Sequence, residues 1–137
     1  MNFKNVAYWA MVIFLAAIFL IGGADKLTAM ENWKDRFVNQ WSLPAWLAPI
    51  TGVAEILGGL MLLIPRLTTV GAAVVIIVMF GATGTHIMAS EWPRIIVPLV
   101  FGAMAGTLFQ WSLLRAKVTG ATATTKSWSG PGSISWR

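Results

Sequence analysis

The sequence contains no cysteine and a single histidine, His86. Without cysteine, the chain cannot form disulfides, thiolate metal sites, iron–sulfur clusters or a CxxC redox pair. One histidine also excludes a bis-histidine haem or metal centre built from this chain alone. We therefore expect no metal site, and any function must rely on few reactive groups.

Charged residues are also scarce. They make up 11% of the 137 residues, against about 25% in ordinary soluble domains, while 57% are hydrophobic. This composition excludes a water-soluble globule and indicates a membrane protein. In a soluble protein the formal charge of +5 would suggest nucleic-acid binding. In a membrane chain it reflects topology and contact with anionic headgroups, so we expect membrane lipids as partners and no nucleic acid.

Long apolar segments separated by short polar connections account for most of the chain. Each is close to the roughly 20 residues that an α-helix needs to cross a bilayer. The second and third loops are so short that the helices they join must be antiparallel. The sequence therefore predicts an all-α fold, an integral membrane four-helix bundle in residues 1–114, with spans at about 6–24, 46–64, 67–89 and 95–114.

The connection between the first two spans differs from the others because it is long, charged and aromatic. Thr28 and Glu31 have the spacing of a capping box, which predicts a helix start here. Met30, Trp33, Phe37 and Trp41 follow on one helical face, opposite most of the charged side chains. We predict a short interfacial amphipathic helix over about residues 29–41, ended before Pro44.

Both ends of a four-span chain lie on the same side as the loop at Pro65–Arg66. Basic residues near the spans are equally numerous on the two sides, but acidic residues occur only on the other side. We predict a multi-pass protein of the cytoplasmic (inner) membrane with both termini in the cytoplasm.

The polar basic tail, residues 115–137, is rich in Thr, Ser, Gly and Ala, a composition that cannot bury enough apolar area to fold alone. One interpretation is a disordered extension. The other is a segment that docks on other membrane protein subunits through Trp128 and Trp136, which are unusual in a mere spacer.

Glu55 is the most informative polar residue, because it lies in the middle of the second span. A carboxylate at that depth costs about 2.5–3.5 kcal/mol on insertion scales unless it is protonated, paired or next to water. Gly52, Gly58 and Gly59 surround it along the helix and predict close helix packing, so Glu55 should face the bundle interior. Glu55 is either a proton-carrying or ligand-binding group, or a packing residue.

His86 lies near the outer end of the third span, with Thr83 one turn earlier on the same face. Asp25 and Lys26 follow the first span at the same level, and the lysine side chain can extend back into the bilayer. Each of these residues also has an ordinary structural explanation. If they act together, Lys26, Glu55 and His86 converge on one ligand-binding cavity that opens away from the cytoplasm, with Asp25 and Thr83 beside it.

The fourth span contains Gly102 and Gly106 in a GxxxG arrangement, which predicts a helix-packing seam more strongly than a binding site.

The order of these motifs resembles the DoxX family of small four-helix membrane proteins over roughly residues 10–112. The motifs are GADKL at the end of the first span, GVAEILGGLMLLIP in the second and ATGTH late in the third. Lys26, Glu55, Gly58, Gly59 and His86 carry the pattern. The resemblance implies a cytoplasmic-membrane protein of a group linked by name to thiosulfate:quinone oxidation, and it assigns no reaction to this chain.

These observations give three hypotheses. The first is a small accessory subunit of a membrane redox assembly that holds a quinone or lipid near Glu55, Lys26 and His86. It carries no covalent cofactor and no independent catalytic centre, so any redox role needs partner subunits. The second is a proton-coupled small-molecule transporter, similar to small multidrug resistance proteins, although their glutamate lies in the first span. The third is a purely structural subunit of a larger membrane complex.

Overall fold

The computed structural model describes residues 2–127, and side chains as far as residue 120. All of its regular elements are helical, and their bounds are α1 Phe3–Thr28, α2 Met30–Asp35, the π-helix η1 Arg36–Gln40, α3 Leu47–Leu63, α4 Thr68–Met88, the 3-10 helix η2 Trp92–Ile95 and α5 Ile96–Ser127. Helix α1 packs on α3, α4 packs on α5, and α3 joins the two pairs by packing on α4. The predicted all-α membrane bundle is confirmed.

Three of the long helices have the length and apolarity needed to cross a membrane: α1, α4 and the segment Trp92–Gly120. Helix α3 is a shorter apolar helix of 17 residues, which at 1.5 Å per residue rises about 25 Å. The turn before Leu47 and the extended residue Ile64 before Pro65 set its ends. Among the described residues, the bundle therefore combines three helices with the length to cross a membrane and one shorter apolar helix, α3.

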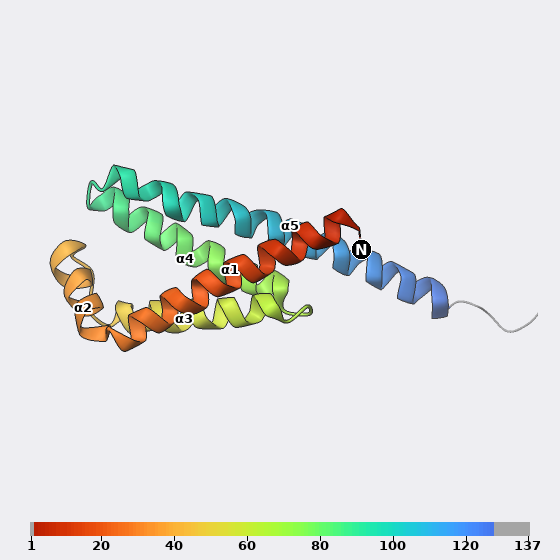
Figure 1. Cartoon of the computed structure of the whole chain (residues 1–137), viewed down its shortest axis with the longest axis horizontal. Helices are drawn as coiled ribbons and strands as arrows, with labels where there is room; N and C mark the ends of the chain where they lie inside the picture. The colour runs from red at the N-terminus through yellow and green to blue at the C-terminus, as the bar shows by residue number, and fades with distance from the viewer. Residues whose placement is uncertain (1, 128–137) are drawn as a thin grey trace, which may run out of the picture.

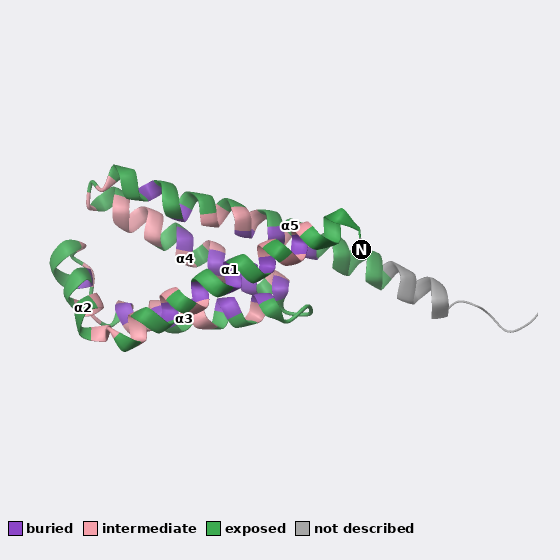
Figure 2. Ribbon diagram, viewed as in Figure 1, coloured by how far each residue is buried: buried purple, intermediate pink, exposed green. Residues whose placement is uncertain are grey.

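The two helix pairs meet at one end and diverge at the other (Figure 1). The N-terminus, the α3–α4 loop and the C-terminal part of α5 lie at the end where the pairs meet. Helix α2 and η1 lie at the opposite end, between the diverging pairs. The buried core follows this shape, because its residues gather where the pairs meet (Figure 2): Tyr8, Val12, Leu15, Ala16, Phe19, Leu62, Ala72, Val75, Met79, Ala105 and Leu108.

The segment predicted as an interfacial helix is helical, as α2 followed by η1, but its predicted capping box is wrong. Helix α1 continues through Thr28, so the Thr28 hydroxyl donates to the carbonyls of Ala24 and Asp25 in its own helix. Ala29 is the N-cap of α2, and Glu31 accepts from Lys34 instead. Thr28 cannot cap a following helix while its hydroxyl lies inside the preceding one.

Helix α5 extends beyond the predicted end of the fourth span, to Ser127. Arg115 holds the first turn of this extension against α1, because its guanidinium lies 3.8 Å from the Tyr8 ring centroid and donates to Asn5 Oδ1 at 2.7 Å. Good helix formers such as Ala, Lys and Arg allow the helix to continue past the apolar segment. Trp128 and Trp136, the predicted docking residues, lie outside the described residues.

Candidate functional site

A buried ion pair joins the first two spans. Lys26 Nζ lies 2.9 Å from Glu55 Oε2, and the two side chains are only 13% and 8% exposed. The close approach of α1 and α3 at their glycines makes this pair possible. A Cβ built on Gly52 would lie 3.0 Å from Lys26 Cβ, and one on Gly23 would lie 2.6 Å from the Gly52 carbonyl oxygen. Glu55 therefore faces the bundle interior, one turn below the contact.

Trp33 covers the lysine of this pair from the interfacial segment. Lys26 Nζ lies 4.5 Å from the Trp33 ring centroid, and the Arg36 guanidinium lies 5.2 Å from the same ring. The indole N–H donates to Asp25 Oδ2 at 2.9 Å, which fixes the ring over the lysine. A cation near an aromatic face is stabilised by the negative charge of that face. Asp25 thus orients the cover over the pair.

A cavity of about 1000 Å³ lies between the diverging helix pairs. Lys26, Glu55 and His86 all line it, so the structure brings the three predicted residues to one space. Its walls are mostly apolar and come from all four long helices; they include Phe19, Ile50, Met79, Phe80, Val97 and Phe101. This size is at the upper end of the range of ordinary small-molecule sites.

The other two predicted ligand residues do not line this cavity. Thr83 donates its hydroxyl to the Met79 carbonyl of its own helix. Asp25 is exposed and accepts from Trp33. Arg36 and Arg94, which the sequence analysis did not select, do line the cavity.

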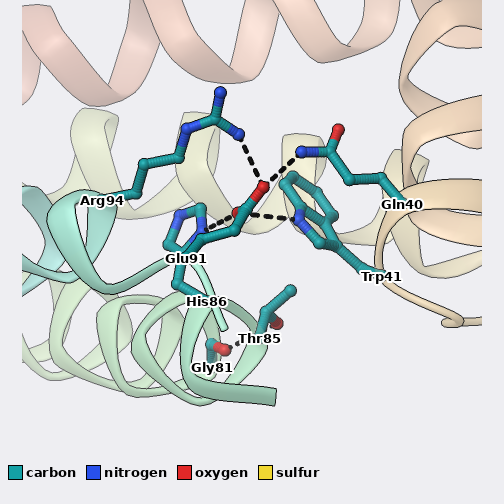
Figure 3. A network of polar contacts seen from close by, with 7 residues as sticks. All are labelled: Gln40, Trp41, Gly81, Thr85, His86, Glu91 and Arg94. Carbon is teal, nitrogen blue, oxygen red and sulfur yellow. Dashed lines mark hydrogen bonds and ion pairs between the residues drawn. The ribbon is translucent and has the colours of Figure 1, made fainter. Parts of the chain in front are cut away.

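Glu91 is the centre of a second polar network at the open end of the bundle (Figure 3). Its Oε2 lies 2.7 Å from His86 Nδ1 and accepts from the Trp41 indole N–H at 3.3 Å. Its Oε1 accepts from Arg94 at 2.7 Å and from the Gln40 amide. The network ties the segment after η1 to the corner between α4 and α5.

These donors determine the ionisation of Glu91. The hydrogen bond from His86 is the largest influence, supported by those from Gln40 and Trp41 and by the charge of Arg94, and together they lower the pKa of Glu91 to about 2. The carboxylate is therefore ionised at neutral pH. The sequence analysis did not find this role, because Glu91 stands in a short polar loop where an acidic residue is ordinary. Its place five residues after the only histidine was the one available signal.

The sequence was compared with protein-family models, curated proteins and solved structures. The model of the DoxX-like family matches residues 10–108. The chain belongs to the DoxX-like family. No curated protein and no solved structure gives a significant match. The matched range of this DoxX-like chain contains the ion pair, the interfacial segment and the Glu91 network.

The glycines of this DoxX-like bundle differ in how closely they pack. Cβ atoms built on Gly52, Gly58 and Gly59 would lie 3.0–3.2 Å from a neighbouring helix, which agrees with their predicted place at helix contacts. Gly102 has only an ordinary contact, 3.5 Å to Met79 Cβ, and Gly106 has nothing within 4 Å. The predicted seam at Gly102 and Gly106 is therefore wrong at Gly106, because α5 faces its neighbours with Ala105 and Leu108.

No group of three or more His, Cys, Asp or Glu side chains in the described part of this DoxX-like chain could hold a metal ion. The cavity lining itself offers charged and hydrogen-bonding groups. Lys26, Arg36 and Arg94 donate hydrogen bonds, Glu55 accepts them, and the histidine ring does either.

Proposed function

We propose that this DoxX-like protein binds a lipophilic molecule with a polar head, a quinone or a lipid, as a small accessory subunit of a membrane redox assembly. The observation that carries the proposal is the cavity of about 1000 Å³, which combines apolar walls with a buried Lys26–Glu55 ion pair. Apolar walls suit a hydrocarbon tail or ring, and a few polar groups fix the orientation of a head.

Chemical complementarity favours a quinone among such molecules. A quinone carbonyl accepts hydrogen bonds from groups such as Lys26, Arg36 or Arg94, and a carboxylate such as Glu55 exchanges protons with its reduced form. The chain has no cysteine and one histidine, and so it has no ligand set for a metal cluster of its own. In this proposal electrons reach the bound molecule from partner subunits.

The proposal places the protein in the cytoplasmic (inner) membrane with both termini in the cytoplasm. The cavity then lies toward the other face, because Trp33, Arg36 and Phe37 of α2 and η1 line it and these two elements lie at the end of the bundle opposite the N-terminus (Figure 1). Partner subunits bind through the C-terminal tail, including Trp128 and Trp136. Cysteine-accessibility labelling at residues 2 and 90, in a chain that has no native cysteine, tests this orientation.

The binding site is tested by filling the cavity. Gly84 lines the cavity and has nothing within 4 Å of a built Cβ, so Gly84→Leu starts a side chain from open space and adds volume at the cavity wall. Gly106→Leu is the matched control, since Gly106 also has nothing within 4 Å and does not line the cavity. The probe is ubiquinone-1, with affinity measured by quenching of tryptophan fluorescence in detergent micelles, where Trp33 and Trp41 line the site.

We expect Gly84→Leu to weaken ubiquinone-1 binding about tenfold or more and Gly106→Leu to leave it unchanged. Mass spectrometry of lipids extracted from the purified protein should identify a lipophile that is depleted in the Gly84→Leu variant. Equal affinities of the two variants, or no binding by the wild type, would overturn the proposal.

A further inference from the structure

Glu91 does not line the cavity, but three of its four side-chain partners do. Trp41, His86 and Arg94 come from three separate segments, and all three contact both the cavity and the Glu91 carboxylate. The residues next to this network, Ser42 and Ser90, both have left-handed backbone angles, φ 53° and φ 56°. Non-glycine residues adopt this conformation rarely and usually where the surrounding structure requires it. The fold therefore accommodates an uncommon backbone next to Glu91, at Ser90, and next to its partner Trp41, at Ser42.

The carboxylate determines which nitrogen of His86 carries a proton. An ionised carboxylate only accepts hydrogen bonds, so at 2.7 Å the His86 Nδ1 must be the donor. The other oxygen of Glu91 already accepts from the Arg94 guanidinium at 2.7 Å. In the neutral ring with a proton on Nδ1, Nε2 is a free acceptor.

The acceptor nitrogen is accessible. Figure 3 shows the second ring nitrogen of His86 directed away from Glu91. No described residue hydrogen-bonds to this nitrogen. Every fully buried polar side-chain atom among the described residues has a hydrogen-bond partner, so this nitrogen is not fully buried. His86 lines the cavity, and its Nε2 has no hydrogen-bond partner among the described residues.

We propose that His86 Nε2 accepts a hydrogen bond from the head group of the bound molecule. The cavity then selects a hydroxyl-bearing molecule, a hydroquinone, over the corresponding quinone. Glu91 is the positioning residue for this contact. The inference rests on the proposed function, because it names the ligand class of the same cavity. A quinone carbonyl has no proton to donate to a bare nitrogen, whereas a hydroquinone donates one.

The single histidine makes this test direct. Selective ¹⁵N-histidine labelling gives one imidazole spectrum from the whole chain. At about pH 8 we expect long-range ¹H–¹⁵N spectra to show a protonated Nδ1 and an unprotonated Nε2. Glu91→Gln replaces the carboxylate with an amide that can donate to Nδ1, and should shift the ring toward the form protonated at Nε2. Glu31→Gln, at an exposed carboxylate away from the cavity, is the matched control and should change nothing.

Binding of ubiquinol-1 and ubiquinone-1 is then compared without oxygen. We expect the wild type and Glu31→Gln to bind ubiquinol-1 about tenfold more tightly, with a shift of the Nε2 resonance, and Glu91→Gln to lose most of this preference. Equal affinities for the two forms, or a wild-type Nε2 that carries a proton, would overturn the inference and leave the proposed function intact. If neither probe binds, the proposed function fails and the inference fails with it.

Discussion

The Lys26–Glu55 pair should be strongly coupled in stability, because the two charges are close and nearly inaccessible to solvent. Their separation of 2.9 Å corresponds to an attraction of about 6 kcal/mol at an effective dielectric constant of about 20. Desolvation of both ions opposes this attraction by several kcal/mol. The pair as a whole therefore contributes little net stability, while the loss of one partner leaves an uncompensated buried charge.

The perturbation is a double-mutant cycle of Lys26→Met, Glu55→Gln and the combined variant. We expect each single substitution to cost about 3 kcal/mol, the low end of the range for breaking a buried pair, since Trp33 still faces the lysine and a lone carboxyl can take up a proton. The combined variant should cost little, because the intact pair contributes little net stability. The coupling energy is then at least about 3 kcal/mol. The assay is reversible unfolding in mixed micelles, followed by tryptophan fluorescence.

The Lys34–Glu31 pair provides a matched control. Its N–O distance is also 2.9 Å, but the Glu31 side chain is 86% exposed. The same substitutions, Lys34→Met and Glu31→Gln, should give a coupling energy below about 0.5 kcal/mol, because water screens the pair. If Lys26→Met and Glu55→Gln were additive, or coupled no more strongly than the control pair, the argument from burial would be refuted.

Two further predictions concern Glu91 and the glycines. Because the native pKa of Glu91 is lowered from about 4.5 to about 2, its stabilising effect is present above pH 4.5 and is lost as the pH falls toward 2. The unfolding temperature should therefore fall more steeply over this range in the wild type than in Glu91→Gln, and parallel curves would contradict the network. Gly23→Ala should destabilise the bundle by about 1–3 kcal/mol, since the new Cβ would lie 2.6 Å from the Gly52 carbonyl oxygen. Gly106→Ala, in open space, should be neutral or stabilise α5 by up to about 1 kcal/mol. Thermal unfolding measures both variants. A similar loss of stability in both would contradict the difference in packing between the two glycines.

The α1–α3 contact shows which features of the ion pair could be predicted from the sequence and which could not. The buried face of α3 was predictable from Glu55 and its glycines, since a charged group in a membrane span must avoid lipid. The sequence placed Lys26 and Glu55 at one cavity, but their direct contact at 2.9 Å required the structure, because it depends on how closely Gly23 and Gly52 let the two helices approach. Gly23 and Gly71 have the closest contacts of the described glycines. Gly23 opens the GADKL motif and Gly71 stands in none, and neither was predicted as a packing residue.

The wrong predictions have local causes. Thr28 and Glu31 match a capping box in spacing, but helix α1 extends through Thr28 and takes its hydroxyl. Gly102 and Gly106 match a packing motif, but the rotation of α5 turns Ala105 and Leu108 to the core instead. In both cases contacts elsewhere set the length or the rotation of the helix, so the residues of the short motif did not make the contact that their spacing predicts.

The sequence by itself determined the membrane class, the four apolar helical segments, the helical connection between the first two of them and the inward direction of Glu55. Hydrophobic length and the cost of a charge in hydrocarbon are local properties, and they can be read without knowing any neighbour. Only the tertiary structure decided that the helix pairs diverge around a cavity, and that Glu91 orients His86 while also contacting Trp41 and Arg94. Such arrangements depend on packing angles and on side chains about 50 residues apart, and no local pattern encodes them.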